Sequence, residues 1–452
     1  MSKIKEIKAR EILSSGSSPS LEVKVTLSSS MIGIASVPYG ASAGVHEACV
    51  LLDNDPKRFM GKGMLKAVFN INEKIAPKLI GMEPYDQRGI DKIMIELDGT
   101  ENKSNLGGNA ILGVSLAVAR AAANEKMIPF YKYIRDVFNL DINSWKLPNP
   151  MMVVIEGGKH ADQSTDFQEY MISPIGGSSV KENVRMGIEI YLRLKKVFKE
   201  NGLNTNVGNE GAFAPAGLIS KQPDITITRA FAPSAIGSNE APFSFMMKAI
   251  EDTGYKIGED IGISIDPAIS ELYDEKKKKY VLQKEGKELS SEEIINYFVN
   301  WVEKYPIITL EDILGEDDWE NWPKLTERLG SKIPIIGDDL TVTSQKRLQK
   351  AIDTKSINAI LIKLNQIGSL TECVDCCMLA RKHGFMTVVS HRGGGETNDT
   401  SMVDLAVAVG SGFIKVGPSR GERVCKYNRL MEIEDELGEL SSPVGKDFRK
   451  VM

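Results

Sequence analysis

Three carboxylic acids, Asp266, Glu311 and Asp338, each end a short apolar run in the second half of the chain. Oxygen ligands without thiolates or clustered histidines suit a hard cation, and Mg²⁺ above all. Because neighbouring carboxylates repel one another, a shared cation would also offset the cost of bringing them together. The alternative is three unrelated acids that cap helices or form surface ion pairs. Their position in successive runs favours the metal site.

Lys363 and Glu210 are the candidates for proton transfer. Lys363 ends the apolar run 360–362. Partial burial and nearby cations can bring a lysine into the range of a base, although a simple ion pair with Asp338 is an equal alternative. Glu210 lies in the turn-rich segment 206–211. Its carboxyl group is a candidate proton donor to complement a lysine base, whereas a single Glu in a loop is commonly just solvated.

Glycine-rich loops carry further polar groups. His160 lies in the segment 157–162, and His391 and Arg392 precede three consecutive glycines that begin at Gly393. The planar fork of Arg392 and the point charge of Lys415 suit a phosphate group. The glycines also leave backbone N–H groups free for an anion. These features are compatible with a small phosphorylated ligand.

The elements that must position these groups follow from their spacing. Charged residues end apolar runs at positions 311, 338, 363, 391 and 415, at intervals of 24 to 28 residues, and the run 167–168 likewise leads into Glu169. A strand, a helix and two loops need about that length, so these are successive βα units. A closed βα barrel gathers the carboxyl ends of its strands on one face. We therefore predict a barrel, with an open doubly wound sheet as the alternative.

The first 140 residues follow a different pattern. Segments 21–27 and 31–37 predict strands, 14–19 and 40–44 are turn-rich, and 109–124 is typical of an Ala-rich helix. We predict an α+β domain with mobile loops at 1–140 and the barrel at 141–452. The boundary is expected near the Pro-containing segment 145–150.

The composition excludes several classes of protein. Among 452 residues, 42% are hydrophobic and 26% are charged, as in soluble globular proteins. The net charge of −5 disfavours a general nucleic-acid coat. No apolar stretch approaches the roughly 20 residues of a membrane span. Five cysteines exclude a disulfide scaffold, and those at 373, 376 and 377 are expected to pack in the core. With no signal-peptide core near its start, the chain is expected to be cytoplasmic.

Several longer segments resemble the enolases, the glycolytic phosphopyruvate hydratases. The resemblance covers nearly the whole chain, and its strongest segments are 40–48, 307–312, 337–343, 362–371, 390–397 and 423–428. It implies an enolase-type TIM-like barrel with an antiparallel start, an N-terminal α+β domain before it, and a homodimer. The implied reaction is the Mg²⁺-dependent, reversible loss of water from 2-phospho-D-glycerate, which gives phosphoenolpyruvate.

The resemblance also implies a role for each matching residue. Asp266, Glu311 and Asp338 would hold the first of two Mg²⁺ ions, and Ser42 on a loop would reach the second. A lysine or histidine base with one or two Mg²⁺ ions is the known pattern of the enolase superfamily and does not follow from the residues alone.

The proton-transfer roles carry over in the same way. Lys363 would remove the C2 proton, and Glu210 would protonate the departing hydroxyl with the assistance of Glu169. His391 would close over the substrate. Glu311 and Asp338 would also face the substrate from the metal side. The other substrate contacts would come from His160, Gln168, Arg392, Gly393 and Lys415.

The departures from the family pattern cluster around these groups. The segment 14–19 lacks the acid and the arginine of the family's Asp-Ser-Arg-Gly-Asn-Pro. Asn209 stands where an Asp usually precedes the general acid, and Gly393 replaces the usual phosphate-binding Ser. The motif 212–215 recurs at 230–233, which marks 216–236 as an insertion.

These departures leave alternatives to an active enolase. One is a catalytically weak or inactive enolase paralogue that keeps the fold for a binding or structural role. Another is a superfamily member that acts on a different 2-hydroxy acid, although the retained Arg392 and Lys415 count against it. Because the charged groups are retained, we favour the active enzyme.

Overall fold

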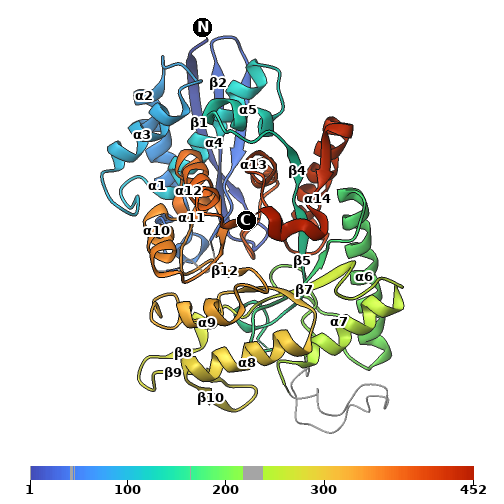
Figure 1. Cartoon of the computed structure of the whole chain (residues 1–452). Helices are drawn as coiled ribbons and strands as arrows, with labels where there is room; N and C mark the ends of the chain where they lie inside the picture. Colours follow the sequence, from blue (N-terminus) through green and yellow to red (C-terminus); the bar gives the residue numbers. More distant parts are fainter. Residues whose placement is uncertain (1, 41–43, 45, 163, 217–237, 452) are drawn as a thin grey trace.

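The structure, a computed structural model, describes residues 2–40, 44, 46–162, 164–216 and 238–451. Ser42 and nearly all of the predicted insertion at 216–236 therefore lie outside the described residues. Figure 1 shows an N-terminal sheet with its helices at the top and a barrel below. Three helices of the C-terminal half lie against the N-terminal elements: α11 (Leu364–Ile367), α12 (Leu370–Lys382) and α13 (Ser401–Val409).

The N-terminal sheet is antiparallel and has three strands in the order β1 (Ile4–Leu13), β2 (Pro19–Leu27) and β3 (Ile32–Ser36). The strands predicted at 21–27 and 31–37 are confirmed. Along β2, Leu21, Val23 and Val25 are fully buried, whereas Lys24 between them is exposed. This alternation places one face of the sheet in the core.

The Ala-rich helix predicted at 109–124 is α4 (Gly108–Glu125), which is buried over nearly its whole length. It packs directly on β2 and β3. A Cβ atom at Gly33 of β3 would lie 2.1 Å from the carbonyl oxygen of Ala117, so the two backbones approach as closely as glycine allows. The other N-terminal helices are α1 (Leu65–Phe69), α2 (Ala76–Leu79), α3 (Gln87–Asp98) and α5 (Phe130–Phe138).

The second half of the chain forms a closed barrel, as predicted. In order around the ring its strands are β11 (Ile307–Glu311), β12 (Ile335–Gly337), β13 (Ala359–Ile362), β14 (Met386–Ser390), β15 (Phe413–Val416), β5 (Asn149–Glu156), β6 (Glu169–Pro174) and β7 (Ile261–Asp266). All are buried throughout. The barrel rather than the open sheet is therefore confirmed.

The first two barrel strands in the chain, β5 and β6, form an antiparallel pair. β6 pairs antiparallel with both β5 and β7, and the other neighbours are parallel. One sequence prediction is wrong in detail here: Glu169 begins a strand, β6, and does not end one. Because β6 runs against its neighbours, its first residue lies at the face where the other strands end. Glu169 still reaches the predicted mouth, opposite Glu156 and Asp266 in the strand register.

Helices cover the outside of the barrel (Figure 1). Side-chain caps fix where some of them begin. Ser290 and Glu293 form a reciprocal capping box at the start of α8, the helix that begins at Ser291. Ser369 accepts the N–H of Glu372 at the start of α12. The remaining helices are α6 (Val180–Glu200), α7 (Ala241–Asp252), α8 (Ser291–Lys304), α9 (Trp322–Leu329), α10 (Gln345–Thr354) and α14 (Val424–Leu437).

Two small sheets complete the fold. β4 (Trp145–Leu147) pairs in parallel with β16 (Ser441–Pro443), and β8 (Tyr273–Asp274), β9 (Lys279–Leu282) and β10 (Lys287–Leu289) form the other. β4 lies in the segment predicted to separate the two domains; the division between residues 140 and 141 itself stays a prediction.

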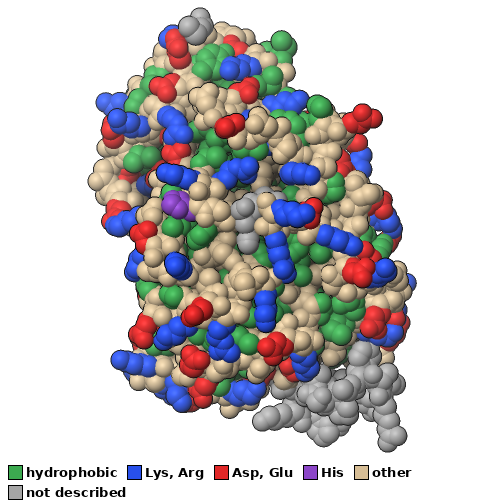
Figure 2. Space-filling model, in the orientation of Figure 1, with side chains coloured by type: hydrophobic (Ala, Val, Ile, Leu, Met, Phe, Trp, Pro, Cys, Tyr) green, Lys and Arg blue, Asp and Glu red, His purple; other side chains and the backbone are tan. Residues whose placement is uncertain are grey.

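The surface and core agree with the compositional analysis. No helix within the described ranges is both long and apolar enough to span a bilayer. Cys373, Cys376 and Cys377 are buried on α12, as expected for core residues. Figure 2 shows that Lys and Arg side chains gather across the middle of one face, while acidic side chains are frequent below and at the sides.

Candidate active site

A cavity of about 400 Å³ opens at the mouth of the barrel. It brings together residues from distant parts of the sequence. Glu311 is buried and contacts the lining residue Lys415, whereas Ser42 lies outside the described residues. The other predicted site residues all line the cavity: His160, Gln168, Glu169, Glu210, Asp266, Asp338, Lys363, His391, Arg392, Gly393 and Lys415.

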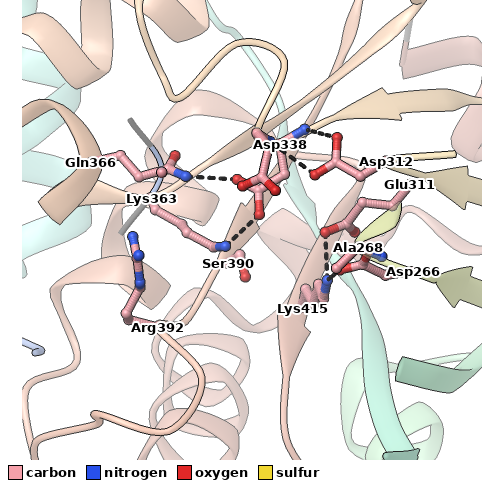
Figure 3. A network of polar contacts seen from close by, with 12 residues as sticks. Asp266, Ala268, Glu311, Asp312, Asp338, Lys363, Gln366, Ser390, Arg392 and Lys415 are labelled. Atoms are coloured by element: carbon pink, nitrogen blue, oxygen red, sulfur yellow. Dashed lines mark hydrogen bonds and ion pairs between the residues drawn. The ribbon is translucent and has the colours of Figure 1, made fainter. Parts of the chain in front are cut away.

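The three predicted metal-binding acids lie at the carboxyl ends of adjacent strands, Asp266 on β7, Glu311 on β11 and Asp338 directly after β12 (Figure 3). Lys415 of β15 points among them. Its Nζ lies 2.8 Å from Asp266 Oδ2, 2.5 Å from Glu311 Oε1 and 2.8 Å from Glu169 Oε2. Burial opposes the charged form, but these carboxylates outweigh it and raise the pKa of Lys415 well above its ordinary value. The ammonium group is thus a counter-cation within the acid cluster.

Asp338 is paired with the predicted base. The Nζ of Lys363 donates to Asp338 Oδ2, and Gln366 Nε2 donates to Asp338 Oδ1 at 2.7 Å. Burial favours the neutral amine, but the charge of Asp338 outweighs it and raises the pKa of Lys363 above its ordinary value. The structure therefore contains the ion pair that the sequence left as an alternative. A role as base requires Asp338 to exchange Lys363 for another partner.

The acid cluster fits a hard divalent cation. Glu311 Oε2 is buried and has no hydrogen-bond partner among the described residues. Burial, and then the charge of Asp266, raise the pKa of Glu311 well above its ordinary value. A cation bound by these oxygens would supply the missing partner and relieve the repulsion, as oxygen ligands do for Mg²⁺.

A second group of acids adjoins the first. Asp312, Asp338 and Asp339 bring carboxylate oxygens within 4.8 Å of one another. Asp312 accepts the backbone N–H of Asp338 at 3.0 Å and that of Asp339 at 2.8 Å. Asp312 and Asp339 were not among the predicted site residues. The available signal was their position, since each directly follows a predicted ligand.

Glu210 faces two histidines across the cavity wall. His160 Nδ1 lies 3.3 Å from Glu210 Oε1, and His391 Nε2 lies 3.5 Å from Glu210 Oε2. Burial opposes ionisation of Glu210, but the histidines outweigh it and lower its pKa well below the ordinary value. Burial, and then the charge of Glu210, raise the pKa of Glu169 well above its ordinary value. Burial and neighbouring charges therefore favour the protonated form more strongly for Glu169 than for Glu210.

The loop that carries Glu210 is attached to the end of β5. Glu156 N donates to the carbonyl oxygen of Phe213 at 2.9 Å, and Phe213 N donates to that of Val154 at 2.9 Å. The side chain of Glu156 accepts the N–H of Glu210 at 3.1 Å. Backbone pairing with a core strand thus fixes a loop that the sequence describes only as turn-rich.

Gly393 lies against the carboxyl group of Glu210. A Cβ atom at Gly393 would be 1.5 Å from Glu210 Oε1. A side chain at position 393 and this position of Glu210 therefore exclude each other. The absence of a serine at position 393 is therefore what allows Glu210 to take the position seen here.

The segments that contain Ser15 and Tyr39 contact the glycine-rich loop after Arg392. Ser15 N donates to the carbonyl oxygen of Glu396 at 2.8 Å, and Tyr39 N donates to that of Gly395 at 2.8 Å. A Cβ atom at Gly16 would lie 2.2 Å from the carbonyl oxygen of Gly394. The departures at 14–19 and 393–395 are therefore in direct contact, and the glycine at position 16 permits it.

Arg392 is buried and held by a carboxylate. Its Nη1 donates to Glu47 Oε2 at 2.6 Å and its Nη2 to Glu47 Oε1 at 3.0 Å. The sequence did not single out Glu47, although it lies in the segment 40–48. In this structure a bound phosphate would share Arg392 with Glu47. Arg392 and Lys415, predicted to act together, have different partners here.

A closed α/β barrel with buried acids, two lysines and a carboxyl–histidine cluster at its mouth defines an α/β-barrel protein with an enzyme-like, acid-rich active face. Comparison with known families makes this specific. The chain matches the enolase N-terminal domain over residues 4–134 and the enolase C-terminal TIM barrel domain over residues 144–452. The chain belongs to the enolase family.

Proposed function

We propose that this protein catalyses the Mg²⁺-dependent, reversible dehydration of 2-phospho-D-glycerate to phosphoenolpyruvate. The observation that carries the proposal is the placement of Lys363 and Glu210 on two sides of one cavity. Lys363 follows β13 and the Glu210 loop adjoins β5, and β14 and β15 separate these strands in the ring. A base and an acid on two sides of a substrate are what removal of a proton and of a hydroxyl from neighbouring carbons requires.

Lys363 removes the C2 proton in this proposal. An α-proton beside a carboxylate is a very weak acid, so positive charge must be concentrated near the developing anion. Lys415 supplies such a charge from β15. Lys363 becomes a competent base once Asp338 no longer holds its ammonium group.

On the other side, Glu210 delivers the proton to the departing hydroxyl. Glu169 assists it from the neighbouring strand, since one ligand atom each of Glu169, Glu210 and His160 lie within 4.8 Å of one another. The raised pKa of Glu169 suits it to restore a proton to Glu210. His391 and Gln168 complete the walls around the hydroxyl.

Asp266, Glu311 and Asp338 would hold one Mg²⁺ ion, which supplies charge stabilisation for the substrate carboxylate. A second ion, with Ser42 as a ligand, is part of the same proposal. Arg392, the backbone at Gly393, and Lys415 would hold the phosphate. The family resemblance further leads us to propose a cytoplasmic homodimer, which light scattering and fractionation test.

The test is the rise of enolpyruvate absorbance with purified protein and 2-phosphoglycerate, while Mg²⁺ is titrated from zero. We expect a rate that depends on Mg²⁺, disappears with a chelator and falls at least about 10³-fold in Lys363→Ala. A folded parent protein with no more activity than Lys363→Ala would refute the proposal. That result would support the alternative of an inactive paralogue. Two observations favour this alternative: Glu47 already binds Arg392, and position 393 has no side chain.

A further inference from the structure

Glu156 is a buried carboxyl group that the proposed reaction does not use. It ends β5, its relative exposure is 0%, and it is not part of the cavity wall. It lies behind Glu210, one layer further from the substrate space. A buried acid in this position is costly unless its charge or its hydrogen bonds are compensated.

Its contacts connect it to the predicted proton donor. Glu156 Oε2 accepts the backbone N–H of Glu210 at 3.1 Å and lies 3.9 Å from His160 Nδ1. The other oxygen, Oε1, has no hydrogen-bond partner among the described residues. A Cβ atom at Gly208 would lie 2.5 Å from Glu156 Cδ, so the Glu210 loop is folded tightly around this side chain.

The surroundings of Glu156 decide its charge. Glu210 and His160 face it from the loops, Glu169 is opposite it on β6, and Tyr191 and Arg423 lie near it on α6 and before α14. Burial, and then the charge of Glu210, raise the pKa of Glu156 to about 8. At neutral pH Glu156 is therefore a neutral acid, and Glu210 carries the negative charge of the two.

We propose that Glu156 is a positioning residue for Glu210: as a neutral acid it fixes the loop at Glu210 and keeps a second negative charge away from the anionic substrate. The inference rests on the proposed function. It identifies a residue that acts through Glu210 and does not touch the substrate.

Two variants separate the effect of Glu156 on the position of Glu210 from the effect of its own charge. Glu156→Gln keeps the size, the neutral state and an oxygen that accepts the Glu210 N–H, so we expect kcat at pH 7 within about threefold of the parent. Glu156→Ala removes the acceptor and leaves a cavity, and a displaced acid can lower kcat by about 10- to 100-fold. The parent should lose kcat as pH rises through about 8, where Glu156 ionises, and Glu156→Gln should lack this loss.

Two results would contradict the inference. If kcat at pH 7 falls as far in Glu156→Gln as in Glu156→Ala, the negative charge of Glu156 is needed and the inference is wrong. Equal kcat and equal pH profiles in the parent and both variants would also overturn it. Should Glu156→Ala not fold, the pH profiles of the parent and Glu156→Gln decide alone.

A second measurement is independent of turnover. The folded protein raises the pKa of Glu156 from an ordinary 4.5 to about 8, so it binds this proton more tightly than the unfolded chain does. The stability of the parent relative to Glu156→Gln should therefore fall as pH rises from about 4.5 to about 8 and stay level above that. A parent without turnover refutes the proposed function, whereas parallel stability profiles refute the neutral Glu156.

Discussion

At the scale of single residues, two lysines neutralise the acids of the site. Lys415 contacts Asp266 and Glu311, and Lys363 contacts Asp338. Removing one partner of a buried ion pair typically costs about 3–5 kcal/mol, because the other charge is left without compensation. A cation that binds the acids changes both pairings together. In the proposed mechanism, binding of the metal would therefore also release the base.

The contact between Gly393 and Glu210 gives the first residue-scale prediction. In Gly393→Ser the new Cβ atom would occupy the place of Glu210 Oε1, 1.5 Å away, so the carboxyl group must rotate out of its position between the histidines. We expect kcat to fall by about 10- to 100-fold, as for a displaced catalytic group, in a protein that remains folded by circular dichroism.

Gly315→Ala is the matched control, because the nearest atom to its new Cβ would be 3.4 Å away, an ordinary contact outside the cavity. Its kcat should equal that of the parent. A Gly393→Ser protein with undiminished kcat would mean that Glu210 is not the proton donor in the position described here.

The sequence identifies only those site residues whose own neighbourhood carries a signal. Asp266, Glu311 and Lys363 could be predicted because each ends an apolar run, and strand ends converge in a barrel. Glu47 and Glu156 could not. Their significance comes from partners 345 and 54 residues away, Arg392 and Glu210, and no local pattern encodes such contacts.

At the scale of elements, the antiparallel strand β6 decides how the mouth is built. A regular βα unit would place the first residue of this strand at the far end of the barrel. The reversal brings Glu169 beside Asp266. The spacing of the apolar runs predicted the later βα units, but it does not show in which direction a strand runs. The antiparallel start was therefore expected only from the family resemblance, and the apolar pattern placed Glu169 at the wrong end of its strand.

Close packing between α4 and β3 gives an element-scale prediction. In Gly33→Ala the new Cβ atom would lie 2.1 Å from Ala117 O and 2.3 Å from Ala121 N, and these backbone atoms cannot move without displacing the helix. We expect the free energy of unfolding to fall by about 1–3 kcal/mol, measured by urea denaturation.

Ile34→Ala on the same strand serves as the control. Its side chain is 45% exposed, so its removal should change the urea midpoint much less. Equal midpoints for Gly33→Ala and the parent would show that strand and helix are further apart than described.

At the scale of the whole molecule, the active site is completed across the contact between residues 1–140 and the barrel. Glu47 reaches Arg392, Arg88 pairs with Asp375, and the loop at Ser15 bonds to Glu396. The segments 14–19 and 393–395, which both depart from the family pattern, meet along this contact. Their changes therefore alter one shared surface, and compensation between them is physically possible because they touch.

The pair Glu47–Arg392 tests this view of the molecule. Both side chains are buried, so in Glu47→Gln the guanidinium loses its counter-charge and the free energy of unfolding should fall by about 3–5 kcal/mol in urea. A bound phosphate would replace the negative charge that Glu47 provides, so inorganic phosphate should raise the melting temperature of Glu47→Gln more than that of the parent. Glu101→Gln is the matched control, because Glu101 pairs with Lys346 across the same two parts of the chain but both side chains are exposed. It should resemble the parent in both measurements. An equally stable Glu47→Gln, or a phosphate response no larger than the parent's, would mean that Glu47 does not hold Arg392 in solution.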